Sequence, residues 1–231
     1  MIFDPLYLLL MAPAFLFSLF ASFWVKSSFR KYSKIVTASG ITGAQAADRI
    51  LRSKGISDVE IGPTTGFLSD FYDPSSKTLR LSPDVYKGRS VSSIGVAAHE
   101  AGHALQHADG YAPLKLRTAI VPMANIGSNF AWILLIAGMF LGMVGLIKIG
   151  VILFSAVVAF QVVTLPVEIN ASRRALAAIS SSGILMAEEV AGARRVLTAA
   201  AMTYVAAAAT AILTLLYFLV RSGLLGGGGR D

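Results

Sequence analysis

Four long apolar segments constrain the fold of this 231-residue chain more than any other feature. A helix needs about 20 apolar residues to cross the hydrocarbon core of a bilayer. The composition agrees, because 55% of the residues are hydrophobic and only 14% are charged, whereas a soluble domain carries about 25% charge. We therefore expect a mainly α membrane protein with about four transmembrane helices, at residues 6–25, 121–147, 149–165 and 197–220.

The first apolar segment has two interpretations, a cleaved signal peptide and a retained anchor. A signal peptide begins with basic residues and ends at a small-residue cleavage site. Here Asp4 precedes the segment, and Lys26, Arg30 and Lys31 follow it. A retained anchor fits this distribution of charge better. The second and third segments are separated only by Lys148 and its neighbouring glycines, which predicts a tight transmembrane hairpin.

The polar segment 26–119 is expected to form a small α+β region. Thr42 and Gln45 have the spacing of a capping box, so a helix should start there and end near Lys54. Strand-like runs and a second helix follow, and a turn signal at 73–76 predicts a β-hairpin. The strands are predicted at 59–61, 67–72 and 78–81, the second helix at 91–108, a further helical segment at 166–195 and a flexible tail at 221–231.

The basic residues are distributed unevenly between the two predicted sides of the membrane. Residues 26–119 contain 13 Lys and Arg, residues 168–196 contain four, and the remaining three are Lys148, Arg221 and Arg230. Cytoplasmic loops carry the excess of Lys and Arg, so both polar segments are predicted on the cytoplasmic side of the cell membrane. This explains the net charge of +7 without nucleic acid, which we do not expect as a partner.

All three histidines lie within nine residues, and the chain has no cysteine. A metal site must therefore use imidazole and carboxylate ligands. His99 and His103 are four residues apart, so on a helix both rings project from one face and can bind one zinc ion. Glu100 lies on the same turn but is offset, so it can take the proton of a zinc-bound water. Two hydrogen-bonded core histidines are the alternative.

A third zinc ligand is needed, and two residues are candidates. His107 follows His103 by four residues, but a straight helix carries it about 12 Å along the axis from His99. Glu168 follows Pro166 at the end of the third apolar segment, where a carboxylate at a membrane boundary needs a partner. We favour Glu168, the alternative being a solvated glutamate at a helix start.

Two stretches of the sequence carry a family resemblance. The run from Ala98 to His107, with Gly110-Tyr111-Ala112-Pro113-Leu114 after it, and the run from Leu165 to Ala175 resemble the signatures of the bacterial neutral zinc metallopeptidase family of the YugP type. The four apolar segments and their order are similar too, so the resemblance covers most of the chain. It implies a membrane zinc peptidase.

More distantly, the layout resembles the HtpX and CAAX-prenyl-protease class. In that class a strand pair precedes the motif helix, and a Glu after further membrane helices completes the zinc site; Glu168 matches it. This chain departs four residues later, where Ser172 replaces the usual Asp, and it has no later His to stabilise an oxyanion. That role stays open between His107, Tyr111, Asn170 and Arg173, and Asp109 is a candidate to orient a ligand histidine.

The sequence thus favours a zinc metalloendopeptidase, gluzincin-like in its Glu ligand, with one zinc per chain. Its substrates would be peptides or proteins, membrane proteins among them. A non-catalytic membrane scaffold with a structural zinc is the alternative, but such a site has no need for Glu100. A transporter is disfavoured, because ionisable residues avoid the interiors of the apolar segments.

Overall fold

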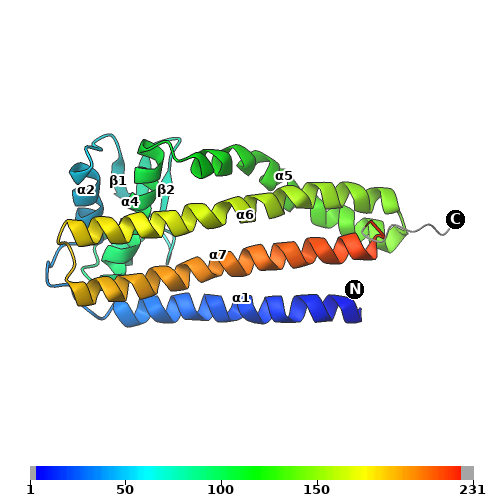
Figure 1. Ribbon diagram of the computed structural model, residues 1–231, viewed down its shortest axis with the longest axis horizontal. Helices are drawn as coiled ribbons and strands as arrows, with labels where there is room; N and C mark the ends of the chain where they lie inside the picture. Colours follow the sequence, from blue (N-terminus) through cyan, green and yellow to red (C-terminus); the bar gives the residue numbers. More distant parts are fainter. Residues whose placement is uncertain (1–3, 225–231) are drawn as a thin grey trace. The chain divides into compact units, whose positions relative to one another are not determined.

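The computed structural model describes residues 4–224 and contains four long helices (Figure 1). Each is long and apolar enough to cross a membrane. The mainly α membrane fold with four spans and a small α+β region is therefore confirmed. The four helices are α1 (Pro5–Tyr32), α5 (Ala112–Leu141), α6 (Val144–Ser181) and α7 (Ala187–Arg221).

The chain divides into two compact units, and each long helix contributes residues to both. The described part of the first unit consists of residues 4–20, 116–165 and 203–224, which are the apolar portions of the long helices. The second unit consists of Ala21–Lys115 and Pro166–Met202 and holds all the remaining elements. Every residue of the candidate site described below belongs to the second unit.

Glycines allow close helix packing in the first unit. A Cβ atom on Gly127 of α5 would lie 2.4 Å from the Leu153 carbonyl oxygen of α6, and one on Gly150 would lie 2.7 Å from a side-chain carbon of Leu135. Small residues at such contacts are typical of membrane helices, because close packing rather than water exclusion drives their association. The buried cluster beside this contact comprises Ala131, Leu135, Ile147, Val151, Phe154, Tyr217 and Phe218.

The turn between α5 and α6 lies at residues 142–143, so the prediction that placed it at Lys148 was wrong. Gly142 has a φ of +67°, a conformation that glycine adopts without steric cost. Lys148 instead lies in the second turn of α6 with an exposed side chain. A lysine near a helix end can extend its amine towards the polar interface, so its charge did not mark a helix boundary.

The predicted separate helical segment at 166–195 was also wrong. Helix α6 runs without interruption past Pro166 to Ser181, and α7 starts at Ala187 and continues through the fourth apolar segment. Proline is tolerated inside membrane-spanning helices, and a change from apolar to polar sequence does not by itself end a helix. The actual break is at 182–186, where Gly183 has a φ of +63°.

The second unit contains a three-stranded sheet and three shorter helices. The strands are β1 (Glu60–Pro63), β2 (Phe71–Asp73) and β3 (Thr78–Leu81), and their order is β1-β3-β2. The predicted hairpin is present as the antiparallel pair β2–β3, whereas β1 pairs with β3 in parallel. The helices are α2 (Gly43–Ser53), α3 (Pro83–Tyr86) and α4 (Val91–Ala108).

Local sequence signals explain several of these boundaries. Thr42 and Gln45 form the predicted capping box at the start of α2. The run predicted as a strand at 67–72 pairs only from Phe71, because the chain turns at Gly66 and Leu68, which both have positive φ. Asp70 accepts hydrogen bonds from the backbone and hydroxyl of Ser82, so its side chain is satisfied outside the sheet.

Helix α4 lies at the centre of the second unit, with the bounds predicted from the sequence. Ser90 caps its start by accepting a hydrogen bond from the Ser93 backbone, and Gly110 follows its end with a φ of +63°. Most of its residues are buried, and it packs against α2 and β2. A helix buried on most sides needs partners for every polar side chain it carries.

The predicted tail begins in α7 at Arg221, and residues 225–231 lie outside the described part of the chain.

Candidate metal centre

Helix α4 presents two histidine rings on one face. His99 and His103 are one helical turn apart, and their ring centroids are 4.8 Å apart, edge to face. The side chains are 13% and 8% exposed, respectively. Glu100, between them in sequence, is 7% exposed. The spacing that suggested a paired ligand set therefore produces two adjacent, largely buried imidazoles.

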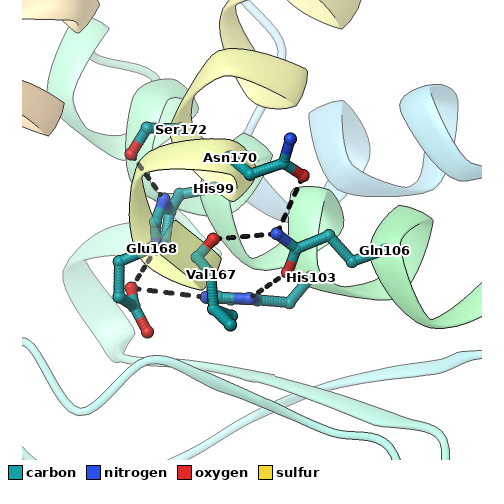
Figure 2. A network of polar contacts seen from close by, with 7 residues as sticks. All are labelled: His99, His103, Gln106, Val167, Glu168, Asn170 and Ser172. Carbon is teal, nitrogen blue, oxygen red and sulfur yellow. Dashed lines mark hydrogen bonds and ion pairs between the residues drawn. The ribbon is translucent and has the colours of Figure 1, made fainter. Parts of the chain in front are cut away.

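Helix α6 places Glu168 against both rings (Figure 2). Its Oε2 atom lies 3.1 Å from Nε2 of His99 and 3.5 Å from Nε2 of His103. The Glu168 side chain is only 2% exposed. The three residues each offer one ligand atom, and these atoms all lie within 4.8 Å of one another. The structure thus brings together the three residues that the sequence predicted as ligands.

This donor set suits zinc. Imidazole nitrogen and carboxylate oxygen bind zinc at about 2.0–2.2 Å, and neighbouring ligand atoms of a tetrahedral ion at that length are about 3.4 Å apart. The two separations from Glu168 Oε2, 3.1 and 3.5 Å, are close to this value. Two imidazoles and one carboxylate form the three-residue set that catalytic zinc sites use when a fourth position is kept for water or substrate.

A glycine permits the approach of the two helices. A Cβ atom on Gly102 of α4 would lie 2.5 Å from the carbonyl oxygen of Ala171 on α6. Any side chain here would collide with backbone, which cannot move as a side chain can. Ala171 follows Glu168 by three residues, so this contact holds the Glu168 turn of α6 against the histidines. Gly102 therefore allows the backbone of Ala171 to approach α4 closely.

Hydrogen bonds hold the outer nitrogens of both rings (Figure 2). Nδ1 of His99 is 3.1 Å from the Ser172 hydroxyl, and Nδ1 of His103 is 3.0 Å from Oε1 of Gln106. Both rings therefore direct Nε2 towards Glu168 and Nδ1 away from it. Such outer partners orient metal-binding histidines and increase their basicity.

Burial determines the electrostatics of the motif helix. Burial raises the pKa of Glu100 above its ordinary value, and positive charge on either histidine would oppose that shift. For His103, burial acts to lower the pKa, but the hydrogen bond to Glu168 and the charge of Glu100 raise it overall. A carboxyl with a raised pKa is a stronger base near neutral pH.

Comparison with known proteins agrees with this geometry. The profile of a family described as "Putative neutral zinc metallopeptidase" matches residues 7–223. The chain belongs to this family. It is also 50% identical over 184 residues to "Putative membrane protease YugP" of Bacillus subtilis (strain 168), which covers 80% of this chain and 82% of that protein. No solved structure matches the chain. Membership of a zinc metallopeptidase family and the buried His-His-Glu group together identify zinc as the cofactor.

The other residues considered for this metallopeptidase site have different surroundings. His107 is half-buried, and its Nδ1 lies 2.9 Å from the Tyr72 hydroxyl of β2. Burial raises the pKa of Tyr72 to about 12, so the phenol is protonated at neutral pH and can donate this bond. Arg173 is exposed. His107 is not part of the group formed by His99, His103 and Glu168.

Asn170, Asp109 and Tyr111 converge on one cation instead of on the histidines. Arg174 donates to Oδ1 of Asn170 at 2.7 Å, forms an ion pair with Asp109, and lies over the Tyr111 ring at 5.8 Å. Asp109, predicted as a direct partner of a ligand histidine, is therefore connected to His103 only through other side chains. Asn170 in turn accepts a hydrogen bond from Gln106.

Sequence reasoning missed Gln106 and gave Ser172 no role. Gln106 lies three residues after His103, which on a helix places the two side chains on neighbouring positions. That spacing could have indicated Gln106 as a partner. Ser172, noted only as a departure from a related class, occupies the position four residues after Glu168 and contacts His99.

Proposed function

We propose that this family member is a zinc metalloendopeptidase in which His99, His103 and Glu168 bind the metal and Glu100 is the catalytic base. One observation carries the proposal: two histidines of α4 and the Glu168 carboxylate of α6 lie close enough together to bind one metal ion. A second carboxylate, that of Glu100, is on the same helix and is not part of this group. A zinc protease with HExxH and a distant glutamate, the gluzincin arrangement, requires these residue types.

The chemistry divides between the metal and Glu100. When bound, zinc polarises the scissile carbonyl and makes water acidic enough to deprotonate near neutral pH. Glu100 accepts the proton of the attacking water and transfers it to the nitrogen of the departing amine. No described residue donates a hydrogen bond to the Glu100 carboxylate, so it is available to water. A structural zinc site does not need a further carboxylate beside its ligands, and burying one is costly.

The polar regions, and with them the site, are proposed to face the cytoplasm. Residues 26–119 and 168–196 hold 17 of the 20 Lys and Arg, and such an excess is typical of cytoplasmic segments.

The chain lacks cysteine, so single cysteines can report the orientation. A membrane-impermeant maleimide added to intact cells should label Gly145→Cys, which lies at the start of α6. It should label Lys54→Cys only after the cells are lysed. The reverse pattern would place the site outside.

Substrates are proposed to be peptides or proteins at the membrane, including membrane proteins. The site belongs to a chain whose four long helices suit a bilayer. An enzyme anchored in this way meets membrane-bound chains at high local concentration.

The test measures bound zinc and proteolysis together. Wild-type protein, Glu100→Gln, Glu168→Ala and the exposed control Glu188→Gln would be purified in detergent. Zinc per chain and cleavage of unfolded casein would be measured for each. The wild type and the control should each bind about one zinc ion per chain and should cleave casein. Glu100→Gln should keep zinc but lose activity, and Glu168→Ala should lose both.

Three results would contradict the proposal. Full zinc content in Glu168→Ala would remove Glu168 from the ligand set. Wild-type activity in Glu100→Gln would remove the catalytic base. Zinc binding by the wild type without cleavage of casein or of membrane proteins would favour the scaffold interpretation instead.

A further inference from the structure

Gln106 is the most completely buried polar side chain next to the metal centre. It is 0% exposed, and all of its hydrogen-bonding atoms contact the site or the α6 turn that carries Glu168 (Figure 2). Its Oε1 lies 3.0 Å from Nδ1 of His103. Its Nε2 lies 2.8 Å from the Val167 carbonyl oxygen and 3.0 Å from Oδ1 of Asn170.

The neighbours of Gln106 determine which way its amide points. The carbonyl of Val167 can only accept a hydrogen bond, so the amide nitrogen must face it. Asn170 gives the same result independently. The guanidinium of Arg174 can only donate, so the Asn170 atom it contacts is the oxygen, and Gln106 must donate to that oxygen too.

The orientation of the amide fixes the protonated nitrogen of His103. With both amide hydrogens directed at α6, Gln106 presents only its oxygen to the ring. Nδ1 of His103 must therefore carry a hydrogen, which leaves the Nε2 lone pair for a metal on the side of Glu168. Ser172 cannot impose the same constraint on His99, because a hydroxyl either donates or accepts.

We infer that Gln106 is a positioning residue that holds His103 with its proton on Nδ1 and its Nε2 directed at the metal position. The inference rests on the proposed function for its metal. The same amide also joins α4 to the Glu168 turn, so two of the three ligands share one hydrogen-bonding side chain. The ion pair of Asp109 with Arg174 extends this network to the surface through Asn170.

Two substitutions distinguish the positioning of His103 by Gln106 from the connection that Gln106 makes between α4 and α6. Gln106→Met keeps the length of the side chain and removes every hydrogen bond. Gln106→Glu keeps an acceptor for His103 and removes both donors to α6. The matched control is Gln45→Met, the same change in the capping box of α2, away from the site. Zinc affinity of the full chain in detergent is measured by competition with a chelator, and the thermal midpoint is measured without metal.

Gln106→Met should weaken zinc binding 10- to 100-fold, the usual effect of losing an outer partner of a metal ligand. Gln106→Glu should keep more zinc affinity than Gln106→Met, because it keeps an acceptor for His103, although its midpoint falls because two bonds to α6 are lost. Gln45→Met should lower the midpoint and leave zinc affinity unchanged. If Gln106→Glu loses as much affinity as Gln106→Met, Gln106 acts only as a bridge between helices and the inference is wrong.

Nuclear magnetic resonance of ¹⁵N-histidine protein tests the proton directly. With only three histidines, the His103 signal is assignable from single variants. A hydrogen-bonded Nδ1–H of His103 should be seen with and without zinc, and its hydrogen-bonded signal should be lost in metal-free Gln106→Met. Absence of a proton on Nδ1 in the wild type would overturn the inference. Because this readout needs no metal, it stands even if the wild type binds no zinc, a result that would refute only the proposed function.

Discussion

Replacing Gly102 by alanine tests whether the approach of α4 and α6 builds the site. The new Cβ would lie 2.5 Å from the Ala171 carbonyl oxygen, 3.1 Å from its carbonyl carbon and 3.3 Å from its Cα. Close carbon–oxygen contacts in proteins are about 3.3 Å or longer, so the helices must separate by roughly 0.8 Å at this point. Because the obstacle is backbone, a rotamer change cannot relieve it.

This separation acts directly on the ligand set. Glu168 lies one turn before Ala171 on α6, and His103 is adjacent to Gly102 on α4. The distance between Glu168 and His103 should therefore grow by a similar amount. Displacing a ligand from an ion that tolerates only about ±0.2 Å should weaken zinc binding at least tenfold. Overpacking of a tight contact should also lower the free energy of unfolding by about 1–3 kcal/mol.

Gly95 supplies a matched control on the same helix. Its added Cβ would lie 3.3 Å from the Cβ of Ala193 on α7, a contact that a small shift can accommodate. Zinc affinity, thermal midpoint and casein cleavage would be measured for Gly102→Ala and Gly95→Ala. Gly102→Ala should lose zinc affinity and activity, whereas Gly95→Ala should keep both. Wild-type zinc affinity in Gly102→Ala would refute the argument that this contact positions Glu168.

Three further predictions concern single side chains. His107→Ala should retain about one zinc per chain, because His107 contacts Tyr72 and not Glu168; loss of the zinc would contradict the ligand assignment. Ser172→Ala should weaken zinc binding only a few-fold, since a neutral hydroxyl partner contributes about 1 kcal/mol, and a chelator titration would measure it; a hundredfold loss would show a larger role. Thr42→Ala should lower the free energy of unfolding by about 1 kcal/mol through loss of the α2 cap, with zinc content unchanged in the same preparation; a loss of zinc would connect α2 to the site.

The parts of the site that could be predicted were those encoded by short spacing. The four-residue interval between His99 and His103 places both rings on one face of any helix, whatever surrounds it. The capping box at Thr42 and the turn before β3 are similarly local. Such signals depend on a few consecutive residues, so tertiary packing did not change them.

Helix boundaries were harder to predict, because polarity served as the marker. The polar sequence after Pro166 suggested a new helix, yet the backbone of α6 continues, since charged side chains are compatible with a helix that leaves the apolar region. Glu168 therefore lies inside a helix and not at its start. It was still a candidate ligand, because a carboxylate at the end of an apolar segment needs a partner.

The contacts of Gln106 with α6 could not be predicted from the sequence, because they join residues more than 60 positions apart. Both acceptors of its amide, Val167 and Asn170, belong to α6. A glutamine within an apolar helix is equally compatible with an exposed position. Only the packing of α4 against α6, which Gly102 permits, shows that it is buried beside His103.

X-ray absorption at the zinc edge of the loaded protein tests the central claim most directly. The wild-type spectrum should show two imidazole ligands together with oxygen ligands, because His99, His103 and Glu168 are the proposed ligands. It should be unchanged in His107→Ala and altered in Glu168→Ala. Three imidazole ligands in the wild type, reduced to two by His107→Ala, would show that His107 and not Glu168 completes the site and would contradict the account.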